Sequence, residues 1–331
     1  MRRISRLILL LLGAALLLSA VLIQFAVTAV DLPRSPLDFD IRPGSSLASA
    51  SRQIEEAGVG MPAWRFTLLA RLLGKSGQIK AGSYEVARGI TPFGLLEKLT
   101  RGDVSQAELT LIEGWTFRQF RAALDAHPDL RHDTREWTEE RIMAELGATG
   151  AAEGRFFPDT YLFARGSADL QILRRAFEQM EQIVQREWEA RDEGLPYASP
   201  RDALIMASLI EKETGQAGDR AQIASVFVNR LRRGMLLQTD PSVIYGLGLR
   251  FDGNLRKRDL LTDGPYNTYT RAGMPPGPIA TPGLASIQAA LHPARTDLLY
   301  FVARGDGSSQ FSRTLDEHNR AVARYQLRRG N

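Results

Sequence analysis

The apolar residues of the chain fall into one long unbroken stretch near the N-terminus and a series of shorter periodic segments after it. From Leu7 to Val30 there is no charged residue, and apolar side chains dominate throughout. A helix of about 20 apolar residues is long enough to cross the hydrocarbon core of a bilayer. Residues 7–30 are therefore predicted to form a transmembrane helix.

The residues on either side of this stretch predict its orientation and argue against a cleaved signal peptide. Residues 1–6 carry three arginines and Asp31 follows the stretch, so residues 1–6 are expected to form a cytoplasmic tail. A signal peptide has an apolar core of about 7–15 residues, followed by a cleavage site with small residues. The stretch here is longer and lacks a clean site of that kind, so we favour an uncleaved anchor.

Beyond the anchor, the pattern predicts a short linker and then a small folded module. Residues 31–38 are rich in proline and turn-forming residues, which is typical of a linker. From Phe39 onward a strand pattern is followed by two segments with helical spacing, a second strand pattern, and a helix that opens with Thr91 and Pro92. Residues 39–104 are therefore expected to form a β-α-α-β-α module.

Two later segments predict helices of different kinds. Residues 169–191 repeat apolar positions at helical spacing with charges between them, which predicts a long amphipathic helix packed on a core. Residues 202–213 are apolar on every side from Ala203 to Ile210, as in a helix buried within a domain. The expected fold class is α+β, with a larger mixed α+β domain over residues 105–331, in which residues 105–165 are a candidate connecting subdomain.

Composition and charge argue against several kinds of binding and catalysis, but they do not indicate which function the chain has. Lysine and arginine total 42 against 38 acidic residues, and the surplus is spread along the 331 residues, so no basic stripe indicates a nucleic-acid partner. The chain has no cysteine, which excludes disulfides and thiol catalysis. The four histidines lack metal-ligand spacing, and no glycine-rich phosphate loop occurs. We therefore expect neither a metal nor an organic cofactor.

The apolar helix over residues 202–213 ends in two carboxylates, Glu211 and Glu213. The unpaired carbonyls of a helix C-terminus disfavour a nearby negative charge, so the pKa of a carboxyl there is expected to rise, as suits a general acid. Two residues are about 200° apart around a helix, so both cannot face one cleft. The small side chains beside Glu211 favour it slightly, while the simplest alternative is that both glutamates are surface residues paired with basic neighbours.

Further polar clusters follow this helix, and each alone is weak support for a binding site. Residues 238–242 form a polar turn, and residues 266–269 combine two tyrosines with amide and hydroxyl groups, which suits sugar recognition by ring stacking. Residues 274–283 contain four prolines and predict a rigid loop that leads into a helix over 284–291. Such a loop is expected to shape the wall of a site.

Taken in order, these segments resemble the endolytic murein transglycosylase family, also called YceG-like. The resemblance is carried by motifs that extend over nearly all of the chain beyond the anchor: Glu153-Gly154-Arg155-Phe156-Phe157-Pro158-Asp159-Thr160-Tyr161, Glu211-Lys212-Glu213-Thr214, Val226-Phe227-Val228-Asn229-Arg230-Leu231, Leu237-Gln238-Thr239-Asp240-Pro241, Tyr266-Asn267-Thr268-Tyr269, Pro275-Pro276-Gly277-Pro278-Ile279, His292-Pro293-Ala294, Tyr300-Phe301-Val302-Ala303 and His318-Asn319.

The resemblance implies that Glu211 is the catalytic acid/base of a lytic transglycosylase. Such an enzyme cleaves the β-1,4 bond between N-acetylmuramic acid and N-acetylglucosamine and leaves a 1,6-anhydromuramyl end. Because the attacking hydroxyl belongs to the substrate, one glutamate suffices, unlike the usual two-acid plan of glycosidases. By the same resemblance, seven residues would line the substrate cleft: Asn229, Gln238, Thr239, Asp240, Asn267, Thr268 and Tyr269.

The resemblance also implies a partner and a location. Residues 39–104 would be a LysM-like module, and the partners would be peptidoglycan glycan strands, the membrane through a single span, and peptidoglycan synthases as candidates. We expect a single-pass protein of the bacterial inner (cytoplasmic) membrane, with its bulk in the periplasm. There it would terminate the elongation of nascent strands.

Two other functions remain as hypotheses at this point. A membrane-anchored scaffold would bind peptidoglycan for the cell-wall synthases without cutting it. A hydrolytic muramidase would use water and need a second carboxylate opposite Glu211, for which Glu213, Asp240 and Asp159 are the acids within the motifs.

Overall fold

The structure is a computed structural model that describes residues 2–326, with the side chains of residues 2–11, 14 and 15 left out. It begins with helix α1 (Arg2–Val27). Among the residues that it describes, no helix is both long enough and apolar enough to cross a membrane. The structure does not describe all of the side chains in the predicted span over residues 7–30, so this membrane span stays a prediction.

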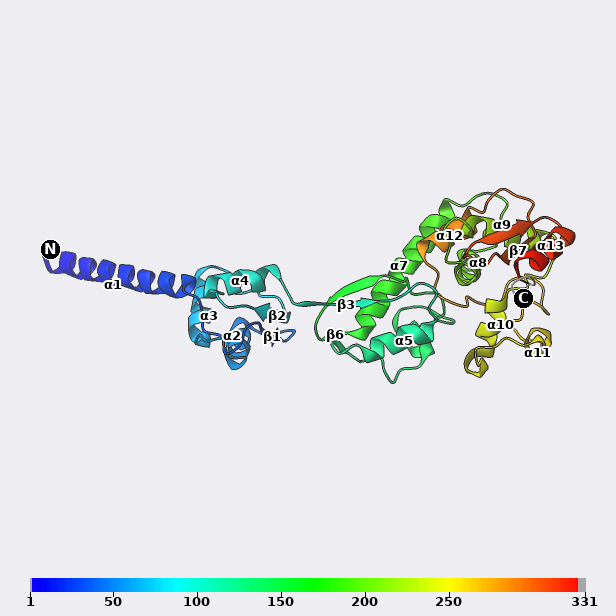
Figure 1. Cartoon of the computed structure of the whole chain (residues 1–331). Helices are drawn as coiled ribbons and strands as arrows, with labels where there is room; N and C mark the ends of the chain where they lie inside the picture. Colours follow the sequence, from blue (N-terminus) through cyan, green and yellow to red (C-terminus); the bar gives the residue numbers. More distant parts are fainter. Residues whose placement is uncertain (1, 327–331) are drawn as a thin grey trace. The chain divides into compact units, whose positions relative to one another are not determined.

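The chain divides into two compact units, each with its own core. Unit 1 contains the residues up to Glu108 together with Leu162–Ser167, and unit 2 contains Leu109–Tyr161 and the residues from Ala168 onward. Helices and strands are mixed in both, so the predicted α+β class is confirmed (Figure 1).

Unit 1 has the predicted order of two strands and three helices after α1. The elements are β1 (Leu37–Ile41), α2 (Leu47–Glu56), α3 (Ala63–Leu72), β2 (Gly82–Val86) and α4 (Pro92–Arg101). Strands β1 and β2 pair antiparallel with Phe39 opposite Tyr84, whose rings stack at 5.8 Å between centroids. Helix α4 begins as predicted, because Thr91 Oγ1 accepts the N–H of Gly94 at 3.0 Å and Pro92 occupies the first turn.

The last turn of α1 and the residues between α1 and β1 contact the core of unit 1. Ala26, in the last turn of α1, is buried in this core, and Val30 donates its N–H to the carbonyl of Ile90 at 2.9 Å. Asp31 forms an antiparallel bridge with Gly60. The stretch predicted as a linker is therefore held against the module through hydrogen bonds and apolar packing.

Unit 2 is built mainly from helices, together with short two-stranded sheets (Figure 1). Strand β3 pairs with β5, β4 with β6, and β7 with β8. Part of β3, part of β5 and the first residue of β6 belong to unit 1. The elements from residue 106 onward are β3 (Gln106–Thr110), α5 (Phe117–Ala126), β4 (Leu130–Arg131), α6 (Glu139–Glu145), β5 (Thr160–Ala164), β6 (Ser167–Ala168), α7 (Asp169–Glu189), α8 (Pro200–Glu213), α9 (Arg220–Arg232), α10 (Asp240–Leu247), η1 (Gly248–Arg250), α11 (Lys257–Leu261), α12 (Leu284–Leu291), β7 (Tyr300–Ala303), β8 (Ser309–Ser312) and α13 (Leu315–Tyr325).

Helix α8 forms the centre of unit 2, as its apolar pattern predicts. Residues 203–210 are all buried, and α7, α9 and α12 pack around them (Figure 1). The helix starts with a capping box, in which Ser199 Oγ accepts the N–H of Asp202 and the Asp202 carboxylate accepts the N–H of Ser199. A helix enclosed on all sides provides a fixed support for the two glutamates at its C-terminus.

Candidate active site

Glu211 lies in the last turn of α8, where the chain leaves the core. Its side chain is half-buried, and its Oε2 accepts a hydrogen bond from the backbone N–H of Gly283 at 3.1 Å. Gly283 immediately precedes α12, with an extended backbone at φ −78° and ψ 170°. A carboxylate at the N-terminus of a helix is stabilised by the helix dipole as well as by the hydrogen bond. Glu211 is thus oriented by backbone from a distant part of the sequence.

The proline-containing loop before α12 is fastened to α8, as its predicted rigidity requires. Ile279 donates its N–H to Ser208 Oγ at 3.1 Å, and Arg201 donates to the carbonyl of Pro276 at 3.1 Å. Gly154 lies so close to the loop that a Cβ atom there would be 2.5 Å from the Cβ of Pro278, and its φ of +76° also favours glycine. These contacts therefore fix the loop, so that the Gly283 N–H lies within hydrogen-bonding distance of Glu211.

A third segment, Glu113 to Trp115, completes the surroundings of Glu211. Gly114 donates its N–H to the carbonyl of Thr281 at 2.8 Å, and Thr281 donates its own N–H to the carbonyl of Trp115 at 2.7 Å. This pairing places the Glu113 carboxyl against Gly283, where a Cβ atom would lie 1.9 Å from Glu113 Oε1. Burial, then the negative charge of Glu211, raises the pKa of Glu113, and Arg220 lowers it.

The second glutamate of α8, Glu213, has different surroundings, as the 200° separation on a helix predicts. Its carboxylate accepts a hydrogen bond from the hydroxyl of Thr239. Burial raises the pKa of Glu213 to about 7, opposed by the Thr239 hydrogen bond and assisted by the charge of Asp240. Glu213 is therefore a half-buried residue whose carboxylate is bonded to Thr239 in the polar turn at residues 238–240.

Three of the predicted cleft residues form one hydrogen-bonded network beside Glu213, and a fourth, Asn267, lies next to it in the chain. Gln238 and Thr239 donate their N–H groups to the carbonyl and to the hydroxyl of Thr268, at 3.1 and 3.0 Å. Thr239 and Thr268 are both buried. Asn267 is also buried, and its Nδ2 donates to the carbonyls of Asp259, Leu260 and Thr262. The buried side chains of Thr239, Asn267 and Thr268 therefore support this part of the chain from its interior.

Three of the predicted cleft residues, Gln238, Asp240 and Tyr269, are at least partly exposed at the surface. The hydroxyl of Tyr269 donates to Asp240 Oδ1 at 2.5 Å, and burial followed by this hydrogen bond raises the pKa of Tyr269. Gln238 has a φ of 52°, an uncommon backbone conformation for a residue other than glycine. Gln238, Asp240 and Tyr269 line a cavity of about 500 Å³ together with Glu213.

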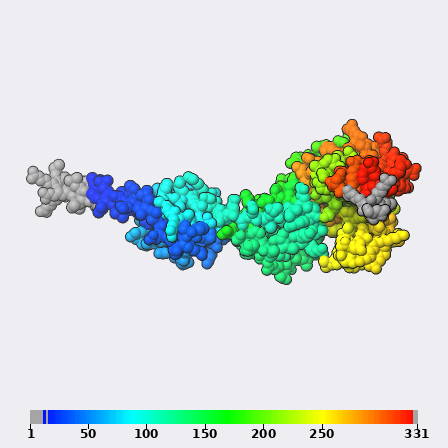
Figure 2. Space-filling model, viewed as in Figure 1, coloured from blue at the N-terminus to red at the C-terminus, as the bar shows by residue number. Residues whose placement is uncertain are grey.

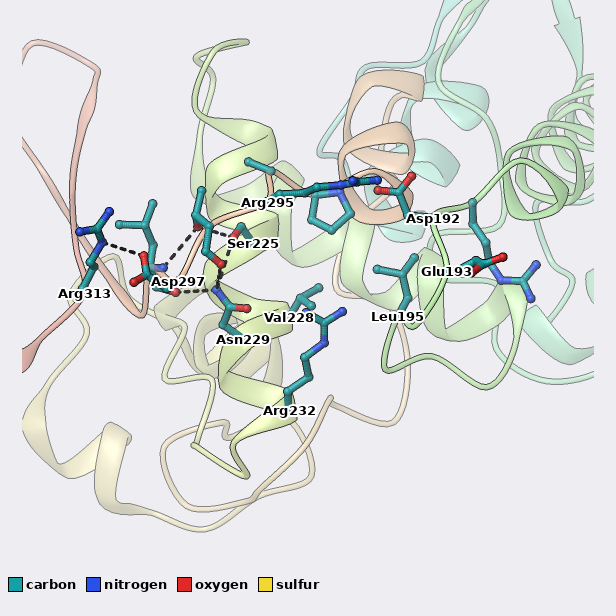
Figure 3. A pocket seen from close by; sticks show the side chains of 15 residues that line it. Asp192, Glu193, Leu195, Ser225, Val228, Asn229, Arg232, Arg295, Asp297 and Arg313 are labelled. Atoms are coloured by element: carbon teal, nitrogen blue, oxygen red, sulfur yellow. Dashed lines mark hydrogen bonds and ion pairs between the residues drawn. The ribbon is translucent and has the colours of Figure 1, made fainter.

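Asn229 lies elsewhere in the unit. It lines a cavity of about 970 Å³ between α9 and the loop after α12 (Figure 3). Its Nδ2 donates to the carbonyls of Thr296 and Leu298 at 2.9 and 3.0 Å. The structure thus brings Gln238, Thr239, Asp240, Thr268 and Tyr269 together, while Asn229 holds the 296–298 loop at a different cavity.

A further cavity of about 820 Å³ adjoins the residue after Glu211. Lys212 lines it with Glu153 and with the beginning of α5 and α10. Figure 2 shows the segment around α5 (teal) and the segment of α10 and α11 (yellow) next to each other at the surface. Glu153 is buried, which raises its pKa to about 7 although the N–H of Phe117 is bonded to its carboxylate. This cavity would offer both polar and apolar surface to an elongated ligand that reaches Glu211.

One group of potential metal ligands occurs among the described residues, and it includes none of the predicted site residues. Asp125, His132 and Asp169 have ligand atoms within 4.8 Å of one another. The Asp169 carboxylate already accepts hydrogen bonds from the N–H and the hydroxyl of Thr134. The described groups nearest to Glu211 include the carboxyl of Glu113 beside Gly283, the backbone N–H of Gly283 and the ammonium of Lys212.

Comparison with known proteins identifies the class to which this fold and site belong. The YceG-like family matches residues 39–324, and the chain belongs to this family, as its motifs predict. A relative from Bacillus subtilis named endolytic murein transglycosylase is 33% identical over 318 residues, which are 88% of this chain and 85% of the relative.

Two further comparisons agree with this assignment. A protein of the same name from Streptococcus pneumoniae serotype 2 is 28% identical over 85% of this chain, and the match spans 57% of that longer relative. The crystal structure of a YceG-like protein from Listeria monocytogenes superposes with a TM-score of 0.56 at 32% identity, covering 86% of this chain and 97% of that one. The fold is therefore shared with a solved member of the family.

Proposed function

We propose that the chain is a lytic transglycosylase that cleaves peptidoglycan glycan strands internally, with Glu211 as the acid/base. The observation that carries this proposal is the Glu211 carboxylate at the end of the buried helix α8, oriented by the N–H of Gly283. The names of the bacterial relatives, with which the chain shares most of its length, agree with it.

In the proposed reaction, protonated Glu211 gives its proton to the oxygen between N-acetylmuramic acid and N-acetylglucosamine, and the bond from C1 to that oxygen breaks. The Glu211 carboxylate then takes the proton of the muramyl C6 hydroxyl, whose oxygen closes on C1. The product is a 1,6-anhydromuramyl end, and Glu211 is protonated again. The Gly283 N–H steadies the carboxylate in the step in which Glu211 is charged.

The predicted cleft residues are proposed to act in two ways. Gln238, Asp240 and Tyr269 line an open cavity with amide, carboxylate and aromatic groups, which suits contact with sugars. The buried Thr239, Asn267 and Thr268 would hold those three in place. Asn229 would act indirectly, because its amide holds the 296–298 loop through hydrogen bonds.

The remaining expectations concern the cellular setting and are proposed with the activity. Residues 7–30 would anchor the protein in the inner membrane with its bulk in the periplasm, and residues 39–104 would act as a LysM-like module on glycan. Cleavage close to the membrane would meet newly made strands and terminate their elongation, beside peptidoglycan synthases.

The test is to incubate the full chain in detergent with uncrosslinked glycan strands and to identify the new ends by mass spectrometry. The Glu211→Gln variant should leave strands intact, whereas Glu213→Gln, at the same helix end, should still cleave. Anhydro ends that vanish with Glu211→Gln support the proposal. Reducing ends would mean a hydrolase, and intact strands that the wild-type protein nevertheless binds would mean the scaffold.

A further inference from the structure

We propose that two adjoining cavities of unit 2 form a tract that binds the uncharged sugar units of the glycan strand on one side of Glu211. This inference rests on the proposed function and deepens it, because internal cleavage requires that the enzyme hold sugars next to the bond that breaks. The first cavity, of about 820 Å³, is the one that Lys212 and Glu153 line. The second, of about 640 Å³, is lined by residues of α7, the start of α8 and the segment 149–155.

The two cavities adjoin, because the same two stretches of chain line both of them. Ala151 and Glu153 belong to the lining of each cavity. Pro278 lines the second cavity, and its neighbour Ile279 lines the first. The cavities therefore meet along residues 151–153 and along the proline-containing loop, and together they offer a longer binding surface than either does alone.

Helix α8 runs beside both cavities and sets the extent of the tract. Arg201, in its first turn, lines the second cavity, and Lys212, in its last turn, lines the first. These two residues are about 16 Å apart along the helix axis, at about 1.5 Å per residue. Gly114 connects the tract to Glu211, because a Cβ atom there would lie 3.9 Å from the side chains of both Glu211 and Lys212. The tract thus begins beside Glu211 and extends along α8.

The segment at which the cavities meet is held by two carboxylates. Glu139 accepts the backbone N–H of Ala152 at 2.6 Å, and Glu153 accepts the backbone N–H of Phe117 at 2.9 Å. A surface that is fixed before binding loses little conformational entropy when a ligand binds to it. This part of the tract is therefore preorganised for an extended ligand.

The charges and the polar groups of the tract indicate uncharged sugars as its ligand. Each cavity is lined by two basic and two acidic side chains: Arg118, Lys212, Glu139 and Glu153 in the first, and Arg155, Arg201, Glu153 and Glu181 in the second. An acidic peptide or a phosphate would be favoured by a surplus of positive charge, which neither cavity has. The amides of Gln182 and Gln185 and the ring of Tyr245 also belong to the lining, and they suit the hydroxyl groups, acetamido groups and ring faces of sugars.

The first experiment measures how tightly the full chain in detergent binds labelled glycan strands of graded length, with Glu211→Gln present to prevent cleavage. Affinity should rise with length until the strand fills the tract. Ala151→Trp places a large ring where the cavities meet and should weaken the binding of long strands by about tenfold, or about 1.4 kcal/mol. Ala151 is exposed, so this change leaves the core intact. Ala144→Trp, at an exposed position of α6, is the matched control and should bind like its parent.

The second experiment fills only the second cavity. Gln182 lines this cavity from an exposed position on α7, so Gln182→Trp narrows it without disturbing the core. Because a strand that starts at Glu211 reaches the first cavity before the second, the loss of affinity should begin at a greater strand length than in Ala151→Trp. Gln171→Trp, exposed on the same helix and outside the cavity, should bind like its parent.

A third comparison identifies the ligand by using strands with and without the short peptides that muramic acid carries. If sugars occupy the tract, Ala151→Trp should weaken the binding of both kinds of strand equally. If its effect vanishes once the peptides are removed, the peptide occupies the tract and the assignment to sugars is overturned.

The outcomes separate this inference from the proposed function. A wild-type chain that produces no anhydro ends would overturn the proposed activity, and the binding measurements would still decide on the tract. An affinity that does not depend on strand length would overturn the tract, as would equal affinities of Ala151→Trp and Ala144→Trp, and either result leaves the activity in place. Should Ala151→Trp fail to fold, the comparison of Gln182→Trp with Gln171→Trp decides alone.

Discussion

The hydroxyl oxygen of Ser208 accepts the backbone N–H of Ile279 at 3.1 Å, and the same hydroxyl donates its proton to the carbonyl of Ile205 at 2.7 Å. Ser208 is fully buried on α8, about one turn before Glu211. A single side chain therefore connects the helix that supports the Glu211 carboxylate to the loop that ends in Gly283. The position of the Gly283 N–H depends on this connection.

Replacing Ser208 with alanine should reduce both stability and activity. The N–H of Ile279 would be buried without a partner, which costs about 1–3 kcal/mol. The loop would also hold Gly283 less firmly, so kcat should fall more than KM changes. Chemical denaturation and initial rates of strand cleavage measure the two effects.

Ser286→Ala is the matched control for this change. Ser286 is equally buried, but its hydroxyl makes none of the hydrogen bonds among the described residues. Its removal should leave the free energy of unfolding nearly unchanged. Equal losses in the two variants would mean that the Ser208 hydroxyl does not fasten the loop.

Glu213 should make the stability of the protein decrease as the pH rises from about 4.5 to about 7. Its folded pKa, about 7, lies above the ordinary value of 4.5, so the folded chain binds the extra proton in this window. The free energy of unfolding then falls with pH, by about 1.4 kcal/mol per pH unit for one proton. In Glu213→Gln this part of the dependence should disappear, as denaturation at a series of pH values would detect.

A carboxylate with the opposite shift provides the control for that experiment. Glu317 accepts the backbone N–H groups of Arg313 and Thr314, which lower its pKa. Its contribution is present above the unfolded pKa and is lost on acidification. Glu317→Gln should therefore lose stability at neutral pH and not in acid. The same pH dependence in both variants would contradict the assignment of the effect to Glu213.

Much of unit 2 follows from periodicity, because a helix enclosed by others needs apolar residues on every side. The run from Ala203 to Ile210 predicts the burial of α8, and the helical angle between Glu211 and Glu213 predicts their separate surroundings. Both predictions are confirmed by the distinct partners Gly283 and Thr239. Local pattern suffices where one helix determines the geometry.

The position of Glu113 could not be predicted in this way. It reaches Gly283 only because Gly114 and Trp115 pair with Thr281, far along the chain, and no local period reports such pairing. Asn229 shows the converse, since its motif indicates a cleft residue while its amide is bonded to the 296–298 loop. In both cases tertiary contacts decide what a polar side chain can reach.

Tyr269→Phe should weaken cleavage by removing one hydrogen bond and keeping the ring. The tyrosine hydroxyl donates to Asp240 Oδ1 at 2.5 Å, so its loss frees an exposed carboxylate that otherwise has a fixed position. A net loss of about 1 kcal/mol corresponds to a several-fold lower kcat/KM, seen mainly in KM if both residues contact the glycan. Unchanged KM with reduced stability would assign the pair a purely structural role.

Shortening the N-terminus should reveal how far the core of unit 1 extends into α1. A chain that starts at Phe25 keeps Ala26 in the core and the hydrogen bond from Val30 to Ile90, whereas one that starts at Asp31 loses both. We expect the shorter chain to be less stable by about 1–3 kcal/mol. Equal denaturation midpoints for the two chains would show that residues 25–30 contribute nothing to this unit.

The chain that starts at Phe25 also tests the proposed anchor, because it lacks most of residues 7–30 while keeping the contacts of unit 1. Its rate on soluble strands should equal that of the full chain, since Glu211, Gly283 and their supports all belong to unit 2. In cells that carry only the shortened chain with an export signal, glycan strands should become longer, because the enzyme is no longer held where strands are made. Chromatography of released strands measures their lengths. Unchanged lengths at equal protein abundance would mean that the cleaving activity does not depend on a membrane anchor.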